Sequence, residues 1–430
     1  MLQQESENER LLEANHQVET NYGSIRNNTA DTRRNDEILK KTILCASLFT
    51  FFGIMWGHFS SQIPVTKENL DISDRHFGLL LLFDDLGSFI GQAIATRFPA
   101  LLRSNLLTPL IGSCVVSVVG LSNLSRTPTQ FGASTLASGI LASFFDIAIN
   151  VQIVILGAIT GRADAPFFHG LFSGGQLIGS GLGTLLTRLA VPFDLRVIGM
   201  LSTLAVIYLI HFPIVRLSGQ LSFDEDENNT TNDEVHNNLP NQATSRQTIR
   251  TKIMILAAVG FFSSLCEGSL SEWAGIYLRQ NLDTSFAVAN SAAFAYSIGM
   301  TVARFAGTWA ARRIGLKAVM LWGSLLASIA MFVGLALNEQ NAFLASLIFA
   351  AIGLANITPL SMAFLSSFSP DKQAISVAKI SLAQQVGFFG GPVLIGNVSG
   401  LIGLRLALTI LPFSSLAIAV WTIPLDVSAR

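Results

Sequence analysis

Charged side chains are scarce in this chain. Asp, Glu, Lys and Arg make up only 13% of its 430 residues, whereas a soluble globular domain carries about 25%. Half of the residues are apolar, and the mean hydropathy is +0.51. This balance excludes an ordinary soluble domain and indicates an integral membrane protein.

The chain also lacks the residues that mark several other protein classes. Its formal net charge is −1, so no basic field favours a nucleic-acid partner. Cys45, Cys114 and Cys266 form neither a CxxC motif nor a cluster with histidine, so we expect no metal site. No nucleotide-binding loop and no nucleophile-base pairing is visible. We therefore expect no enzyme activity and no bound cofactor.

Long apolar runs are what the chain has instead. A helix needs about 20 residues to cross the hydrocarbon core, and helices satisfy their own backbone polar groups there. The sequence predicts twelve such helices, at residues 42–62, 77–96, 105–124, 131–157, 168–188, 197–215, 252–278, 286–308, 318–337, 342–366, 373–398 and 405–424. The predicted fold is an all-α membrane protein with twelve transmembrane helices in two pseudo-symmetric six-helix bundles.

Polar segments separate the two bundles. We predict a polar cytoplasmic tail over 1–41, bundles over 42–216 and 252–424, a disordered cytoplasmic linker over 217–251, and a short tail over 425–430. The linker is rich in Asn and Asp, so it cannot bury enough apolar surface to offset the entropy of ordering. No basic segment followed by an apolar h-region precedes the first span, and we expect no cleaved signal peptide.

The two halves show weak internal symmetry. Glycine recurs every four residues in the fifth helix, at Gly175, Gly179 and Gly183, and in the eleventh at Gly387 and Gly391. This spacing places small residues on one face, so we expect helices five and eleven to pack closely through their glycine faces. Duplicated halves around a central site are typical of transporters.

The distribution of Lys and Arg predicts the orientation. Arg97 with Arg103, and Arg312 and Arg313 with Lys317, lie on the same side of the predicted bundle as the linker. Short basic clusters of this kind stay in the cytoplasm. We therefore expect both ends and the linker in the cytoplasm.

The same features predict the membrane. We expect a multi-pass protein of the plasma (inner) membrane. The acidic dileucine pattern from Glu7 to Leu12 makes an endolysosomal membrane the alternative if the source is eukaryotic.

Twelve spans in two halves with a long central loop resemble the major facilitator superfamily over residues 42–424. The superfamily's loop signature, a glycine followed by an acidic residue and arginines after the second helix of each half, is degenerate here. The segment Gly91–Arg97 lacks the acid, and in Arg304–Gly315 the usual aspartate position is Thr308. The resemblance makes Arg97, Arg304, Arg312 and Arg313 the candidate gating and loop residues. Arg304 and Lys379 could also be counter-charges in the cavity, or Arg304 could simply extend to the cytoplasmic surface from its helix end.

Several segments resemble more particularly the YbjJ-like branch, relatives of the fucose permeases. They are HFSSQIP (58–64), FFDIAINVQ (144–152), FHGLFSGGQLIGSGLG (168–183), EGSLSEWAGIYL (267–278), GLANITPL (353–360) and GFFGGPVLIGNVSGLIGLR (387–405). Their occurrence in the expected order implies a transporter of a small polar solute such as a sugar.

Carboxylates and amides inside predicted spans are the main functional candidates. Asp146, Asn150 and Gln152 lie in one span of the first half, and Glu267 lies in the first span of the second half. An ionisable group there is costly without a partner or a water-filled cavity, so it indicates a substrate or coupling site. The alternative is structural, because Asp146 and Asn150 share a helix face and such a pair can hold a neighbouring helix.

Asp84 and Asp85 form a second candidate. Adjacent residues point about 100° apart on a helix, so both can hardly face one cavity. We expect one of them to pair with a basic residue or to stay neutral. Glu272 and Trp273 approach the outer end of their helix, where a solvated acid and an aromatic belt residue are ordinary.

Four further side chains have both a functional and a structural interpretation. Trp56 and Tyr296 could stack on a flat solute or pack in the core. His58 could shuttle a proton or be a hydrogen-bonded structural residue. Asn356, with Pro359, predicts a break in the tenth helix whose freed carbonyls line a cavity.

Together these features predict a secondary active transporter that works by alternating access, driven by a proton or cation gradient. Its partners would be a small-molecule substrate and membrane lipid, and we expect a monomer. The alternative is a transporter-like membrane protein that senses or scaffolds and moves no solute. Sugar, drug-like and peptide substrates all fit the sequence.

The orientation can be tested with single cysteines in a background without native cysteine. A cysteine at Asn229 lies in the predicted linker, and one at Asn281 lies on the predicted outer side. An impermeant thiol reagent added to intact cells should label Asn281→Cys but not Asn229→Cys. Labelling of both from outside would contradict this topology.

Overall fold

The computed structural model describes residues 2–98, 107–160, 165–217, 242–365 and 370–425, and every regular element in these ranges is an α-helix. The first half contains α1 (Leu2–Leu70), α2 (Asp74–Arg97), α4 (Leu107–Asn123), α5 (Pro128–Thr160), α6 (Ala165–Arg188) and α7 (Phe193–Leu217). The second half contains α8 (Gln242–Asn281), α9 (Phe286–Ile314), α10 (Leu316–Leu337), α11 (Gln340–Leu354), α12 (Ile357–Leu365), α13 (Pro370–Ile402), α14 (Leu404–Ala407) and α15 (Ile410–Thr422).

Ten of the twelve predicted spans each fall on a single helix, and the tenth and twelfth each fall on two consecutive helices, which confirms the all-α fold class. Ten segments in the described part of the chain are long and apolar enough to cross a membrane. The third span, α4, has a shorter apolar part, Leu110–Asn123. The fifth span, α6, is rich in glycine and serine, which lowers its hydropathy.

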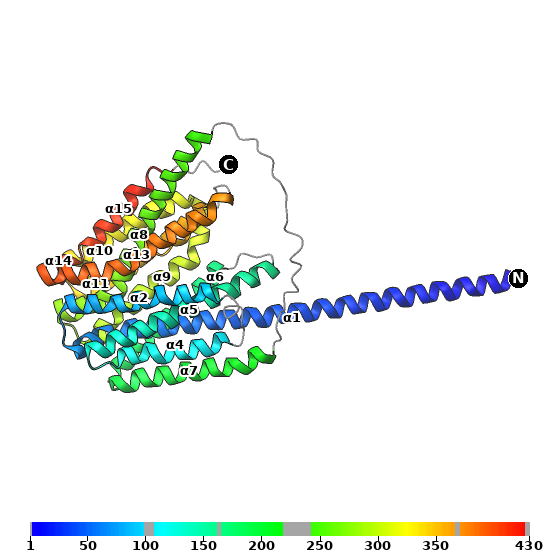
Figure 1. The fold of residues 1–430 in the computed structure, drawn as a ribbon, viewed down its shortest axis with the longest axis horizontal. Helices are drawn as coiled ribbons and strands as arrows, with labels where there is room; N and C mark the ends of the chain where they lie inside the picture. The colour runs from blue at the N-terminus through cyan, green and yellow to red at the C-terminus, as the bar shows by residue number, and fades with distance from the viewer. Residues whose placement is uncertain (1, 99–106, 161–164, 218–241, 366–369, 426–430) are drawn as a thin grey trace.

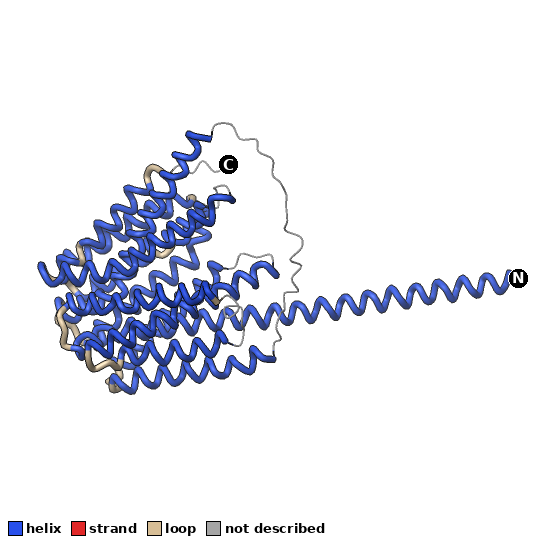
Figure 2. The backbone as a smooth tube through the Cα atoms, in the orientation of Figure 1, coloured by secondary structure: helices blue, strands red, loops and turns tan. Residues whose placement is uncertain are grey.

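Two predicted boundaries differ from the structure. The tail predicted over 1–41 belongs to α1, which continues without a break into the first span and projects beyond the bundle (Figure 1). The smooth tube of Figure 2 shows the same continuous helix. At the linker predicted over 217–251, α8 begins at Gln242, so that helix enters the segment. Residues 218–241 lie outside the described residues.

The predicted break in the tenth span is confirmed. The helix ends at Leu354 and resumes at Ile357 as α12. Pro359 then lies in the first turn of α12, where its missing N–H would have no helical partner. At the break, the Asn356 side-chain amide donates to the Ala303 carbonyl of α9 over 2.8 Å.

Glycine lets two pairs of helices approach until their backbones touch. A Cβ on Gly179 of α6 would lie 2.0 Å from the Ile54 carbonyl oxygen of α1. A Cβ on Gly387 of α13 would lie 2.1 Å from the Phe261 carbonyl oxygen of α8. The close packing of helices five and eleven is therefore present, but each packs on the first helix of its own half. The expectation that they pack through their glycine faces thus holds within each half, not between the halves.

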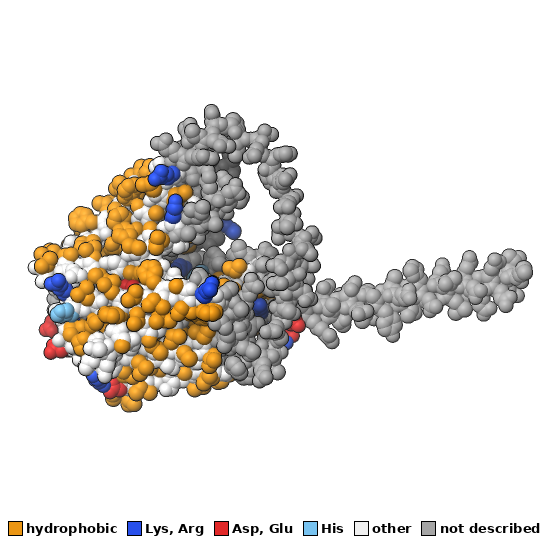
Figure 3. All heavy atoms as spheres, in the orientation of Figure 1, with side chains coloured by type: hydrophobic (Ala, Val, Ile, Leu, Met, Phe, Trp, Pro, Cys, Tyr) orange, Lys and Arg blue, Asp and Glu red, His pale blue; other side chains and the backbone are white. Residues whose placement is uncertain are grey.

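The two halves meet along two other pairs of helices. In the first pair α6 lies against α9, and in the second α2 lies against α13. Figure 1 shows the halves converging at the end that holds the short connections 71–73 and 282–285 and diverging at the opposite end. Figure 3 shows apolar side chains covering the visible face of the bundle. An apolar surface this extensive suits contact with lipid.

The glycine contacts can be tested with matched leucine variants. Gly179→Leu should lower the stability of the folded protein by about 1–3 kcal/mol or more, because the new side chain collides with backbone that cannot move aside. Gly174→Leu in the same helix is the control, since a Cβ there meets nothing within 4 Å. Thermal unfolding of the purified variants measures the difference. Equal unfolding temperatures would contradict the packing described.

Candidate functional site

Glu267 is held by an arginine that also reaches the other half. Its carboxylate in α8 lies 3.5 Å from the Arg304 guanidinium of α9, and the two side chains are 26% and 19% exposed. The same guanidinium donates to the hydroxyl of Ser173 in α6 over 2.6 Å. Arg304, a candidate for a gating loop on sequence grounds, is thus the counter-charge of Glu267 and a direct link between the halves.

Further polar groups surround this ion pair. Tyr296 of α9 is 7% exposed, and its hydroxyl has no hydrogen-bond partner among the described residues. It lies close enough to Glu267 and Arg304 to interact with both electrostatically. His169 of α6 is exposed and interacts in the same way with Arg304. Side chains from α6, α8 and α9 therefore form a site that offers charges and hydrogen bonds to a polar molecule.

A second group of carboxylates lies between α2 and α8. Asp84 hydrogen-bonds to Ser138 of α5, whereas Asp85 lies within electrostatic range of both Asp84 and Glu272. No basic side chain in the described ranges forms an ion pair with any of these three acids. Asp84 likewise lies within electrostatic range of Glu272, so the two neighbouring aspartates share this acid as a neighbour.

The expectation that Glu272 is a solvated acid and Trp273 an aromatic belt residue is wrong. One carboxylate oxygen of Glu272 is buried without a partner in the described chain. Trp273 is fully buried, donates from its indole nitrogen to the Pro392 carbonyl over 3.0 Å, and packs edge-on against Phe77 of the other half at 6.0 Å. Both residues lie near a helix end, where the sequence suggests exposure. The two halves converge at that end and cover them.

Asp146 and Asn150 pair within their own helix. The Asn150 amide donates to the Asp146 backbone carbonyl over 2.8 Å and to its carboxylate over 3.2 Å. The Asp146 side chain is otherwise exposed, whereas Gln152 is 4% exposed. The structure thus keeps Asp146 apart from the Glu267 and Arg304 pair, on α5 of the first half.

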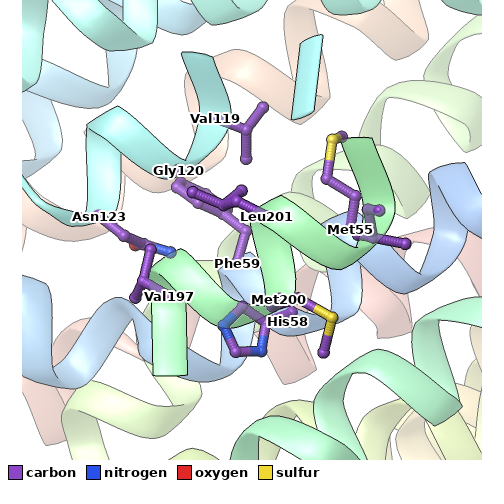
Figure 4. A pocket seen from close by; sticks show the side chains of 10 residues that line it. Met55, His58, Phe59, Val119, Gly120, Asn123, Val197, Met200 and Leu201 are labelled. Carbon is purple, nitrogen blue, oxygen red and sulfur yellow. The ribbon is translucent and has the colours of Figure 1, made fainter. Parts of the chain in front are cut away.

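Trp56 and His58 lie in the interior of the first half. Trp56 is half-buried and packs edge-on against Phe59, with ring centroids 5.5 Å apart. His58 is 3% exposed, and neither ring nitrogen has a hydrogen-bond partner in the described chain. Figure 4 shows its ring beside a small, mostly apolar cavity between α1, α4 and α7, near Asn123 and Met200.

The remaining loop candidates lie at the helix ends. Arg97, Arg312 and Arg313 are all exposed. Arg313 stacks over Trp309 of its own helix at 6.0 Å. None of the three forms an ion pair with an acid in the described part of the chain, in keeping with the missing acid of the degenerate loop signature.

Polar contacts join the helices at the end of the bundle where the two halves converge. We call the five residues that form these contacts the latch: Lys67, Glu68, Asp74, Arg279 and Ser399. The buried Lys67 ammonium pairs with Asp74 at 2.7 Å, and the Ser399 hydroxyl of α13 donates to the same carboxylate over 2.5 Å. Glu68 accepts two hydrogen bonds, of 2.8 and 3.0 Å, from Arg279 of α8. Two contacts therefore join the first half to the second where the halves converge.

Comparison with known proteins supports the architecture. A family model described as the Major Facilitator Superfamily matches residues 256–430. A solved mutant form of the nucleoside transporter NupG superimposes with a TM-score of 0.65 at 14% identity, covering 89% of this chain and 99% of that one. The chain has the major facilitator fold. A solved D-xylose-proton symporter gives a TM-score of 0.64 at 14% identity, with 89% of this chain and 98% of that one covered.

Proteins related in sequence align with most of the chain. An uncharacterised MFS-type transporter of Yersinia pestis is 23% identical over 360 residues, which cover 84% of this chain and 89% of the relative. The membrane protein MosC of Rhizobium meliloti is 22% identical over 371 residues, or 86% of each chain. With the family match over residues 256–430, these relatives make the chain similar to MFS-type membrane proteins along most of its length. The apolar helices agree with an integral, multi-pass membrane protein.

The latch can be tested by reversing its charges. In a cysteine-free background carrying Phe77→Cys, which places a thiol where the halves meet, Glu68→Arg or Arg279→Glu should raise labelling by an impermeant thiol reagent about 1.4- to fivefold. That range follows from the roughly 0.2–1 kcal/mol of a partly exposed ion pair. The double reversal should return labelling to the parent rate.

The control is the exposed pair of Arg126 and Asp194, which lies within the first half. Reversing Arg126 to Glu should leave the labelling rate unchanged. If the double reversal labels as fast as either single variant, the ion pair does not hold the halves together.

Proposed function

We propose that the chain is a secondary active transporter that moves a small polar solute across a membrane by alternating access between its two halves. The halves converge around the latch at one end and diverge at the other (Figure 1). With both termini in the cytoplasm, the latch lies on the outer side, and this conformation faces the cytoplasm. The fold and the family match support this proposal.

One observation carries the proposal furthest. Arg304 binds Glu267 of its own half and Ser173 of the other half. A rocking movement of the halves would separate Arg304 from Ser173, while the contact with Glu267 would travel with the second half. The charge state of Glu267 is therefore linked to the contact that the movement has to break.

Proton coupling follows from the chemistry of this contact. A carboxylate that moves between wet and dry surroundings changes its affinity for protons. A proton on Glu267 would remove the charge that holds Arg304, so that the guanidinium becomes available to the solute. Asp146, Asp84 and Asp85 are further proton acceptors along the proposed path. A gradient of protons would supply the driving force, with no bound cofactor.

Small polar solutes suit the side chains around Arg304. Tyr296 offers an unpartnered hydroxyl group and Arg304 offers N–H donors, as recognition of a sugar-like molecule requires. Two solved structures of the same fold are described as a nucleoside transporter and a D-xylose-proton symporter. We propose a solute of similar size, a monomeric protein and a location in the plasma membrane.

A sensor or scaffold that moves no solute is the second candidate. The projection of α1 beyond the bundle favours it, because such a helix can contact another protein. The two candidates differ in one measurable property. A transporter accumulates solute against its gradient, whereas a sensor only binds it.

Glu267→Gln tests the proposal, since it keeps the size of the side chain and removes its charge. Thermal unfolding of the purified protein with D-xylose, other pentoses and nucleosides would first identify a bound solute, because a ligand stabilises the state that binds it. In proteoliposomes with an imposed pH gradient, the parent should accumulate that solute. Glu267→Gln should lose accumulation by at least about tenfold while retaining exchange at equal pH, because only the coupled step needs the titratable charge.

Glu37→Gln is the matched control, since Glu37 is an exposed acid in α1. It should accumulate solute like the parent. Binding without accumulation in the parent would favour the sensor. Undiminished accumulation in Glu267→Gln would place the coupling group elsewhere, with Asp146→Asn the next variant.

A further inference from the structure

Arg196 is a buried cation without a counter-ion among the described residues. It lies in the first turn of α7 and is 5% exposed. No carboxylate in the described ranges forms an ion pair with it. Its neighbour Asp194 is exposed and pairs with Arg126 instead. The guanidinium lies over the Phe193 ring at 5.6 Å, but the ring carries no net negative charge. Removing a charge from water is costly unless an opposite charge compensates it, so the structure leaves a positive charge to be neutralised.

The hydrogen bonds of this guanidinium are also incomplete. One terminal N–H donates to the hydroxyl of Thr187 in α6, and the buried Nε has no partner in the described chain. The Thr187 hydroxyl is already fully used. It donates to the Gly183 carbonyl over 2.7 Å and accepts a second bond, of 3.0 Å, from the Asn290 amide of α9. Thr187 therefore cannot satisfy the rest of the guanidinium.

Unpartnered polar atoms gather around Arg196. Six of the thirteen such buried side-chain atoms in the described chain belong to this cluster: Nδ1 and Nε2 of His58, Oε1 of Gln62, Oγ1 of Thr184, Nε of Arg196 and Oδ1 of Asn290. His58 interacts electrostatically with Arg196. Gln62 lies against Gly183, where an added Cβ would be 2.8 Å from its Nε2. Thr184 lies one turn before Thr187 on α6.

Both halves of the protein contribute to the cluster. Asn290 is fully buried and belongs to α9 of the second half, whereas α1, α6 and α7 of the first half supply the other side chains. Water alone would satisfy the free hydrogen-bonding atoms but would leave the positive charge uncompensated. A small anion compensates the charge and accepts from the guanidinium, the Thr184 hydroxyl and an imidazole N–H.

We propose that Arg196, His58, Thr184 and Asn290 form a buried site for a small monovalent anion, chloride being the one most available to a cell. Water that enters with the anion donates to the amide oxygens of Gln62 and Asn290. Because the site is built from both halves, an anion bound there stabilises the conformation in which α6 and α9 are together. This inference concerns binding and does not depend on the transport proposed above.

Thermal unfolding of the purified full-length protein tests the site. Sodium chloride is compared with sodium gluconate at the same ionic strength, because gluconate is too large for a buried site of this kind. The unfolding temperature should rise by a few degrees as chloride increases through and above its dissociation constant. Bromide should act like chloride. An unfolding temperature that is the same in chloride and gluconate would overturn the proposal.

Two variants locate the effect. Arg196→Gln should abolish the difference between chloride and gluconate, whereas Arg188→Gln, which changes an exposed arginine at the end of α6, should retain it. Asn290→Asp places a carboxylate beside Arg196 without changing the size of the side chain. It should therefore make the protein stable in gluconate and insensitive to chloride.

Asn290→Asp decides the question if Arg196→Gln does not fold. A full chloride response in Asn290→Asp would overturn the proposal, because a fixed carboxylate would not then compete with the anion. A full response in Arg196→Gln would do the same.

Discussion

Every charge held among apolar helices needs a partner, and this constraint decides where the two halves of the protein touch. Ionised side chains inside a membrane are costly unless they pair or meet water. Glu267 meets Arg304, which reaches across to Ser173, and Glu68 meets Arg279 across the latch. The polar contacts between the halves are therefore those that the proposed alternating access would make and break.

The strength of these contacts differs within and between the halves. Inside each half, glycine brings helix backbones into contact, as between Gly179 and Ile54. Packing this close has low compressibility and does not deform gradually. Between the halves, the ion pair of Glu68 and Arg279 is partly exposed, and such pairs contribute about 1 kcal/mol or less. At the latch end the halves also pack through Gly78 and Gly396, where a Cβ on Gly396 would lie 2.8 Å from the Asp74 carbonyl oxygen. A rocking movement would have to separate this packing as well as the weak polar contacts.

Much of the fold could be predicted from the sequence because its signals are local. Apolar runs of about 20 residues mark the spans. Glycines four residues apart mark a helix face that packs closely on a neighbour, and Asn356 with Pro359 marks a helix break. The pairing of Asp146 with Asn150 is local as well, since the two residues are one turn apart. Each of these features needs only the periodicity of a single helix.

The rest depends on which helices meet, and the sequence does not show this. Trp273 is buried only because Phe77 and Pro392 come from elsewhere in the chain. In the sequence, Arg196 resembles an ordinary basic residue of an outer loop. Only the fold shows that it is buried beside Thr187 of α6, which also accepts a hydrogen bond from Asn290 of α9. The sequence allowed Arg304 to be either a loop arginine or a counter-charge in the cavity, and only the fold shows that its partner is Glu267. A span boundary or a helix face depends on residues that are close together in the sequence. A site at the interface between the two halves depends on which helices pack together.

Distances between spin labels at the two ends of the interface between the halves would reveal a rocking movement. One pair of labels, at His76 and Asn281, spans the latch end, and a second, at Arg97 and Arg312, spans the opposite end; all four positions are exposed. Alternating access predicts two populations in which a longer distance at one end accompanies a shorter distance at the other, with their ratio shifted by pH and by solute. A single fixed distance at both ends, or distances that lengthen together, would contradict it.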